Sequence, residues 1–70
     1  MEEVVVPGDF TPRALGDLVP TSRDYLLVAT HERGHWVFNP SPDHVVQAGA
    51  TLVLMASPDG VAQVQRLLGT

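Results

Sequence analysis

The fold is decided in the middle of the chain by the stretch Phe38-Asn39-Pro40-Ser41-Pro42-Asp43. Two prolines within three residues cannot sit inside a central strand, because proline has no N–H to donate, so this stretch predicts a stiff surface turn. Apolar runs flank the turn. Trp36-Val37-Phe38 precedes it, and residues 51–56 follow it after a second turn at Gln47-Ala48-Gly49. The stretch therefore separates two strands.

The N-terminal half predicts a strand, a short helix and another strand. Val4-Val5-Val6 is a β-branched run closed by Pro7-Gly8, and residues 25–30 are nearly all apolar, which predicts a strand buried on both faces. Between them, Thr11 is expected to cap a helix over residues 12–18 with Pro12 at its first position, and Pro20 prevents its extension. This order predicts a right-handed parallel crossover.

The C-terminal part of the chain repeats the pattern of a helix-capping residue followed by proline. Ser57-Pro58 predicts the start of a helix whose apolar stripe holds Val61, Val64, Leu67 and Leu68, and Gly69 is expected to end it. The predicted order is β-α-β-β-β-α. We therefore expect a small α/β (α+β) domain in which a mixed sheet packs with two helices, with residues 1–70 forming a single unit.

Charge and composition exclude several classes of protein. The net charge is −4, and the four basic residues, all arginines, are scattered along the chain, so nucleic acid is not an expected partner. No apolar run reaches the length of a membrane span, and Glu2 and Glu3 stand where a signal peptide would be basic. A soluble, cytoplasmic protein without direct membrane insertion is expected. The chain has no cysteine, which excludes disulfides and thiolate metal sites.

The length of the chain predicts a homodimer. Burial of apolar surface at ~25 cal/mol/Å² stabilises a chain of 70 residues by on the order of 100 kcal/mol. Ordering the same residues at ~1.5 kcal/mol each costs about as much. Since disulfides are excluded, burial of further apolar surface against a second copy is the remaining way to stabilise the fold.

The order of turns, strands and helix starts along the sequence resembles the TrkA-C, or RCK-C, domain, the C-terminal lobe of regulators of potassium conductance. The resemblance is carried by the stretch 38–43, then Val46, Gly49, the strand Leu52-Val53-Leu54 and the helix start at Ser57-Pro58. It covers the chain from about Val4 to Leu68. Two positions depart from the family pattern: Ala50 replaces the usual aspartate after the turn glycine, and Glu32 precedes Arg33 where the arginine is displaced by one residue.

This resemblance implies a function. Family members carry an N-terminal dinucleotide-binding lobe and work beside, or fused to, a potassium channel or transporter, so residues 1–70 are expected to be one lobe of a longer protein. No Gly-x-Gly-x-x-Gly motif follows a strand here, and no cofactor is expected in this part. We expect a regulatory, ligand-sensing and dimerising lobe rather than an enzyme. The alternative is a purely structural dimerisation domain that binds no ligand.

One motif suggests catalysis but does not fit its surroundings. His31-Glu32-Arg33-Gly34-His35 matches H-E-x-x-H, the zinc metalloprotease motif, which needs two histidines one turn apart on a helix. Here the pentapeptide joins two strands and contains a glycine, so neither a catalytic nor a metal site is expected, and the histidines are expected to be solvated at the end of the hairpin. The alternative is a ligand or metal role for the two histidines. A three-residue loop would pair His31 with His35, whereas a two-residue loop, Arg33-Gly34, would pair His31 with Trp36 and place the histidines on opposite faces. The sequence leaves both loops open.

Candidate ligand residues lie around this hairpin. Arg33, His35 and Asn39 at a strand edge offer positive charge and amide donors to a phosphate, and His31 and Pro40 complete the candidate set. The resemblance implies a small anionic ligand, such as cyclic di-adenosine monophosphate, bound between two C-terminal lobes. The competing interpretation is that Asn39 only stabilises its turn.

Overall fold

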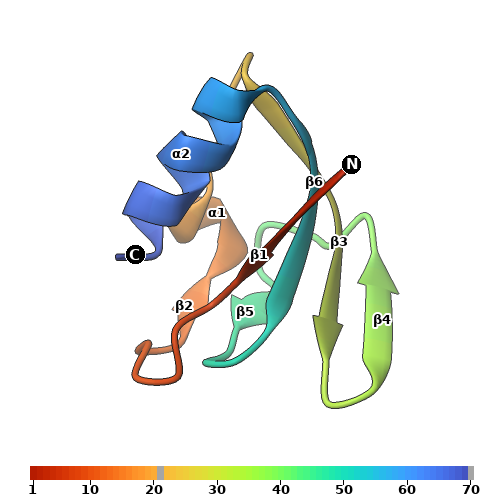
Figure 1. Cartoon of the computed structure of the whole chain (residues 1–70). Helices are drawn as coiled ribbons and strands as arrows, with labels where there is room; N and C mark the ends of the chain where they lie inside the picture. The colour runs from red at the N-terminus through yellow and green to blue at the C-terminus, as the bar shows by residue number, and fades with distance from the viewer. Residues whose placement is uncertain (21, 70) are drawn as a thin grey trace.

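The computed structural model describes residues 1–20 and 22–69, and it has a sheet with both helices on one face (Figure 1). The four-stranded sheet has the order β1-β6-β3-β4, and a two-stranded ribbon pairs β2 with β5. The strands are β1 (Glu2–Val5), β2 (Arg13–Ala14), β3 (Tyr25–Glu32), β4 (His35–Phe38), β5 (Val45–Val46) and β6 (Thr51–Ala56). The helices are α1 (Leu15–Leu18) and α2 (Pro58–Leu67). The predicted fold class is confirmed, with two short strands added.

The sheet is antiparallel throughout, which corrects the expected mixed sheet. Both β1 and β3 pair with β6 in the antiparallel sense. They therefore run in the same direction, as a crossover requires, but β6 lies between them and they do not pair. The sequence predicted the direction of the strands correctly and their adjacency wrongly, because the last strand to be synthesised is inserted into the middle of the sheet.

The start of the first helix is also corrected. Arg13 and Ala14, expected to be helical, are extended and pair with β5, and α1 begins only at Leu15. No side chain caps α1. Instead, the N–H of Leu15 donates to the carbonyl of His44 at 2.8 Å, and that of Gly16 donates to the carbonyl of Pro42 at 2.9 Å. The carbonyls of a distant loop therefore accept the first N–H groups of the helix, the role expected of the Thr11 side chain. The prediction of a helix start at Thr11 and Pro12 was wrong.

The second helix follows its sequence pattern. Ser57 is the N-cap and its hydroxyl accepts a hydrogen bond from the N–H of Gly60 at 3.1 Å, with Pro58 in the first turn. Gly69 follows the helix with φ +82°, a left-handed conformation that favours glycine. Both ends of α2 were predicted correctly.

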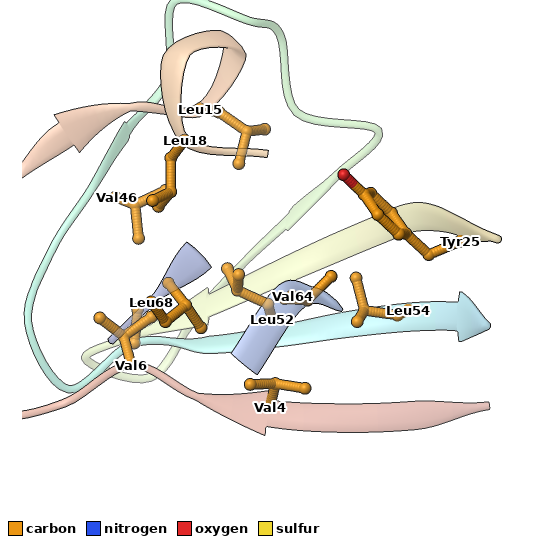
Figure 2. Close-up of a cluster of buried hydrophobic side chains, with 11 residues drawn as sticks. Val4, Val6, Leu15, Leu18, Tyr25, Val46, Leu52, Leu54, Val64 and Leu68 are labelled. Carbon is orange, nitrogen blue, oxygen red and sulfur yellow. The ribbon is translucent and has the colours of Figure 1, made fainter. Parts of the chain in front are cut away.

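The core lies between the helices and one face of the sheet (Figure 2). Leu52 and Leu54 of β6 are fully buried, as is Val64 of α2. The opposite face of the sheet carries the exposed side chains of Leu26 and Met55. The expectation that residues 25–30 are buried on both faces is therefore wrong for this chain alone, because nothing within the described residues covers that second face.

Candidate functional site

A groove of about 400 Å³ lies between α1, the start of β3 and the loop that follows β4. Its walls are mostly apolar, with Ser22 contributing a hydroxyl. The lining residues are Leu15, Gly16, Val19, Pro20, Ser22, Tyr25, Leu26, Leu27, Pro40 and Pro42. A concave, mostly apolar site of this size suits a flat aromatic ring such as a nucleobase, whose faces can pack on apolar side chains.

Hydrogen bonds and close packing fix two walls of the groove. Gly16 lies so near the loop that a Cβ on it would be 2.9 Å from the Cβ of Pro42. On the other wall, the hydroxyl of Tyr25 donates to the carbonyl of Pro20 at 2.5 Å, and burial raises the pKa of Tyr25 above its ordinary value. The hydroxyl proton of Tyr25 is therefore already used within the chain, where it ties β3 to the segment that follows α1.

Among the residues that the structure describes, no charged side chain lines the groove. Within residues 1–20 and 22–69, the one ion pair joins His44 to Glu32. No arginine in that part of the chain therefore has a carboxylate partner. The arginines are thus available to an anion without first breaking an ion pair. A phosphate bound near the groove would need such a charge from outside the groove itself.

The hairpin between β3 and β4 closes with a two-residue turn. Arg33 and Gly34 have φ of +49° and +79°, the two positive values that a type I′ turn requires. His31 consequently pairs with Trp36, and Glu32 pairs with His35. Of the two loops that the sequence left open, the structure has the second: the histidines lie on opposite faces, and the H-E-x-x-H pentapeptide is a turn instead of a helix.

The structure does not bring the five candidate ligand residues together within one chain. Arg33, His35 and His31 lie at the turn end of the hairpin, whereas Asn39 and Pro40 lie beyond the other end of β4. From His35 to Asn39 the strand rises by about 13 Å. Pro40 lines the groove, and Asn39 is exposed in a left-handed conformation, with its N–H donating to the carbonyl of Val28 at 2.9 Å. The Asn39 backbone thus ends the hairpin, whatever its side chain binds.

A residue outside the candidate set fastens the loop. The Nε2 atom of His44 lies 3.1 Å from Oε1 of Glu32 and 3.5 Å from Oγ1 of Thr30, and all three groups are largely buried. This contact joins the far end of the groove-lining loop to β3. Sequence reasoning missed it because the partners are 12 residues apart and no local motif connects them. In the described part of the chain, no group of three or more histidine, cysteine or acidic side chains could hold a metal ion.

Comparison with known proteins assigns the fold to a family. The model of the TrkA-C domain matches residues 1–69. The chain belongs to the TrkA-C domain family. Its fold also matches a solved structure described as the RCK_C domain dimer of S. agalactiae BusR in complex with c-di-AMP, with a TM-score of 0.81 and 18% sequence identity. The match covers 97% of this chain and 93% of the BusR chain. No curated protein sequence matches.

The resemblance inferred from the turn and strand pattern is therefore confirmed. TrkA-C domains are regulatory domains of potassium-transport systems. In this domain, the groove lies beside the uncovered face of the sheet. No helix within residues 1–20 and 22–69 of the TrkA-C domain has the length and apolar content needed to cross a membrane.

Proposed function

We propose that this TrkA-C domain is the ligand-sensing and dimerising lobe of a protein that regulates a potassium channel or transporter. The observation that carries the proposal is the family match over residues 1–69. In this proposal, the chain is one lobe of a longer cytoplasmic protein whose other parts include a dinucleotide-binding lobe. The lobe itself is not an enzyme. Its output is a change in how two copies are arranged.

The proposed ligand is a small anion with flat aromatic rings, such as a cyclic dinucleotide. The apolar groove supports a site for a base, and the BusR domain of the same fold is described in complex with c-di-AMP. The phosphates need positive charge that the groove does not carry. In a dimer, Arg33 of one copy, at the turn that His31 and His35 flank on opposite faces, would meet Asn39 and Pro40 of the other across the seam.

A ligand at a seam can regulate because it touches both copies. If it binds one arrangement of the two copies more tightly than another, it shifts the equilibrium between them by that difference and no more, typically ~1–3 kcal/mol. An attached channel would respond to the changed angle between lobes.

Titration calorimetry with c-di-AMP tests the site directly. Ser22→Glu puts a negative charge into the groove and should abolish binding of the anion. Ser41→Glu is the matched control, because Ser41 is exposed on the same loop system but does not line the groove. Arg33→Ala should weaken binding more than Arg13→Ala, since Arg13 lies on β2, outside the proposed set.

Three outcomes would reject parts of this proposal. Binding weaker than about 1 mM by the parent protein rejects a cyclic dinucleotide as the ligand. Equal binding by Ser22→Glu and Ser41→Glu rejects the groove. Equal binding by the two arginine variants rejects Arg33. A purely structural dimerisation domain is the second candidate, favoured by the lack of charge in the groove, and it predicts no binding of any nucleotide tested.

A further inference from the structure

We propose that the second copy of this chain docks on the outer face of the sheet, the face opposite the helices. This outer face is defined by Val5, Leu26, Trp36, Phe38 and Met55. The inference deepens the dimer of the proposed function and rests on it, because it names the surface that the two copies share.

The strand register places these side chains on one face. Leu26 pairs with Met55, Ala29 pairs with both Phe38 and Val53, and the row containing His31 runs from Trp36 through Thr51 to Val5. Directly paired residues share a face of a sheet. The helices cover the other face (Figure 1). All four strands therefore contribute apolar side chains to one face, in which His31, Thr51 and Glu3 are the polar members.

Most of this surface is open to water in the single chain. The exposed fractions are 62% for Val5, 63% for Leu26, 51% for Trp36, 73% for Phe38 and 55% for Met55. Between these large side chains, Ala29 and Val53 are buried although no other element covers them. The outer face thus has large exposed apolar side chains around the buried Ala29 and Val53, and a flat partner surface can cover it.

The area matches what a dimer needs. A large aromatic side chain buries about 150–250 Å², so the exposed parts of these five side chains amount to on the order of 500 Å² on each copy. Two copies together would bury about 1,000 Å², the lower limit for a specific interface between proteins. An open apolar patch of this size is at the upper end of what monomeric proteins tolerate.

The charges favour a second copy over another kind of partner. Within the strands, the outer face carries one carboxylate, Glu3, on the edge strand β1. At its border, Arg23 and Asp24 offer opposite charges side by side, where they line a shallow hollow with Leu26 and Met55. A twofold axis places the same patch against itself, and here that brings no like charges together near the centre. Trp36 also stacks within its own chain on His31 and Phe38, with ring centroids 4.4 Å and 5.9 Å apart, so the aromatic side chains are already held in place for docking.

Leu26 connects this surface to the groove. It belongs to the outer face and also lines the groove. A second copy covering Leu26 would therefore wall off one side of the groove, and the seam between copies would run beside the ligand.

The chain supplies its own reporter for this proposal. Trp36 is the only tryptophan and lies on the outer face. On dilution of the 70-residue protein, sedimentation should show the dimer dissociating, and the emission of Trp36 should shift to the red over the same concentration range as its ring becomes hydrated. A dimer that dissociates with unchanged Trp36 emission, or a protein that is monomeric at every concentration, overturns the proposal.

Charge variants give an independent test. Phe38→Glu and Leu26→Glu should each raise the dissociation constant of the dimer by 100-fold or more, because each buries two unpaired carboxylates. Leu67→Glu is the matched control: Leu67 is 40% exposed on α2, away from the outer face, and its variant should dimerise like the parent. Circular dichroism checks that each variant folds, and if one does not, the Trp36 measurement on the parent still decides.

The outcomes separate this proposal from the one on which it rests. If c-di-AMP binds and Phe38→Glu still dimerises like the parent, the outer face is wrong while ligand sensing stands. If the charge variants dissociate as expected and no nucleotide binds, the outer face is right and the domain is a structural dimeriser.

Discussion

Gly60→Ala adds only one methyl group, but it should destabilise this domain because the backbone of Asp24 already occupies the space that the methyl group needs. Gly60 lies in the first turn of α2, where the helix crosses the start of β3. A Cβ built on Gly60 would lie 2.1 Å from the carbonyl oxygen of Asp24 and 2.8 Å from the carbonyl carbon. Carbon and oxygen atoms that do not bond stay more than 3 Å apart, so Gly60→Ala must separate the helix from the strand by about 1 Å.

The magnitude follows from three effects. Overpacking of this kind costs about 1–3 kcal/mol. The same carbonyl of Asp24 accepts the N–H of Ser57 at 3.1 Å, and losing that hydrogen bond costs about 1 kcal/mol more. The better helix propensity of alanine offsets about 1 kcal/mol. We expect the free energy of unfolding to fall by about 2 kcal/mol, which for a domain of this size lowers the melting temperature by about 10 °C.

Urea and thermal unfolding followed by circular dichroism measure this loss, at one protein concentration for all variants. Gly8→Ala is the control, because no atom lies within 4 Å of a Cβ there and the backbone of Gly8 is not left-handed. It should be neutral or stabilise by up to ~1 kcal/mol. If Gly60→Ala unfolds within about 0.5 kcal/mol of the parent, the close approach of α2 to Asp24 is refuted.

Three further predictions test local features. Ser57→Ala removes the N-cap of α2 and should lower the free energy of unfolding by about 1 kcal/mol in urea; no change would mean that the cap contributes nothing. Gly34→Ala forces a side chain into φ +79° in the hairpin turn and should lower it by about 1 kcal/mol, whereas Gly8→Ala should not. Burial raises the pKa of Tyr25 above 10.0. The unfolded chain therefore loses this proton at a lower pH than the folded chain, so the free energy of unfolding should fall as the pH rises past 10.0 in the parent, and this fall should be absent in Tyr25→Phe. An ultraviolet titration of this single tyrosine at its ordinary pKa would contradict the prediction.

Local signals explain the parts of the fold that the sequence predicted. Ser57 and Pro58 set the start of α2, and Gly34, Gly49 and Gly69 have the positive φ angles that their places in turns and helix ends suggest. At each of these points, the residue's own chemistry restricts its backbone, and no distant part of the chain is needed.

Long-range pairing decided the parts that the sequence did not predict. Arg13 and Ala14 read as helix but extend to pair with β5, whose partner residues lie more than 30 positions away. The hydrogen bond between His44 and Glu32 likewise joins residues from separate segments. For the candidate site, the structure places Pro40 in the lining of the groove, but the sequence could not show that β4 keeps Asn39 apart from Arg33. Only the hairpin register fixes that separation.

The one-sided sheet links ligand binding to dimerisation in the proposed assembly. The loop that carries Pro40 and Pro42 is fastened to α1 by the N–H groups of Leu15 and Gly16 and to β3 by His44, so it cannot yield independently of the sheet. In the proposed assembly, a ligand in the groove would contact Leu26, which the second copy would also contact. Because a free energy of coupling is reciprocal, any ligand that tightens the dimer must itself bind more tightly to the dimer, by the same factor. Measured at protein concentrations above and below the dissociation constant of the dimer, the affinity for c-di-AMP should differ by that factor, and an affinity independent of protein concentration would show that the groove and the outer face act separately.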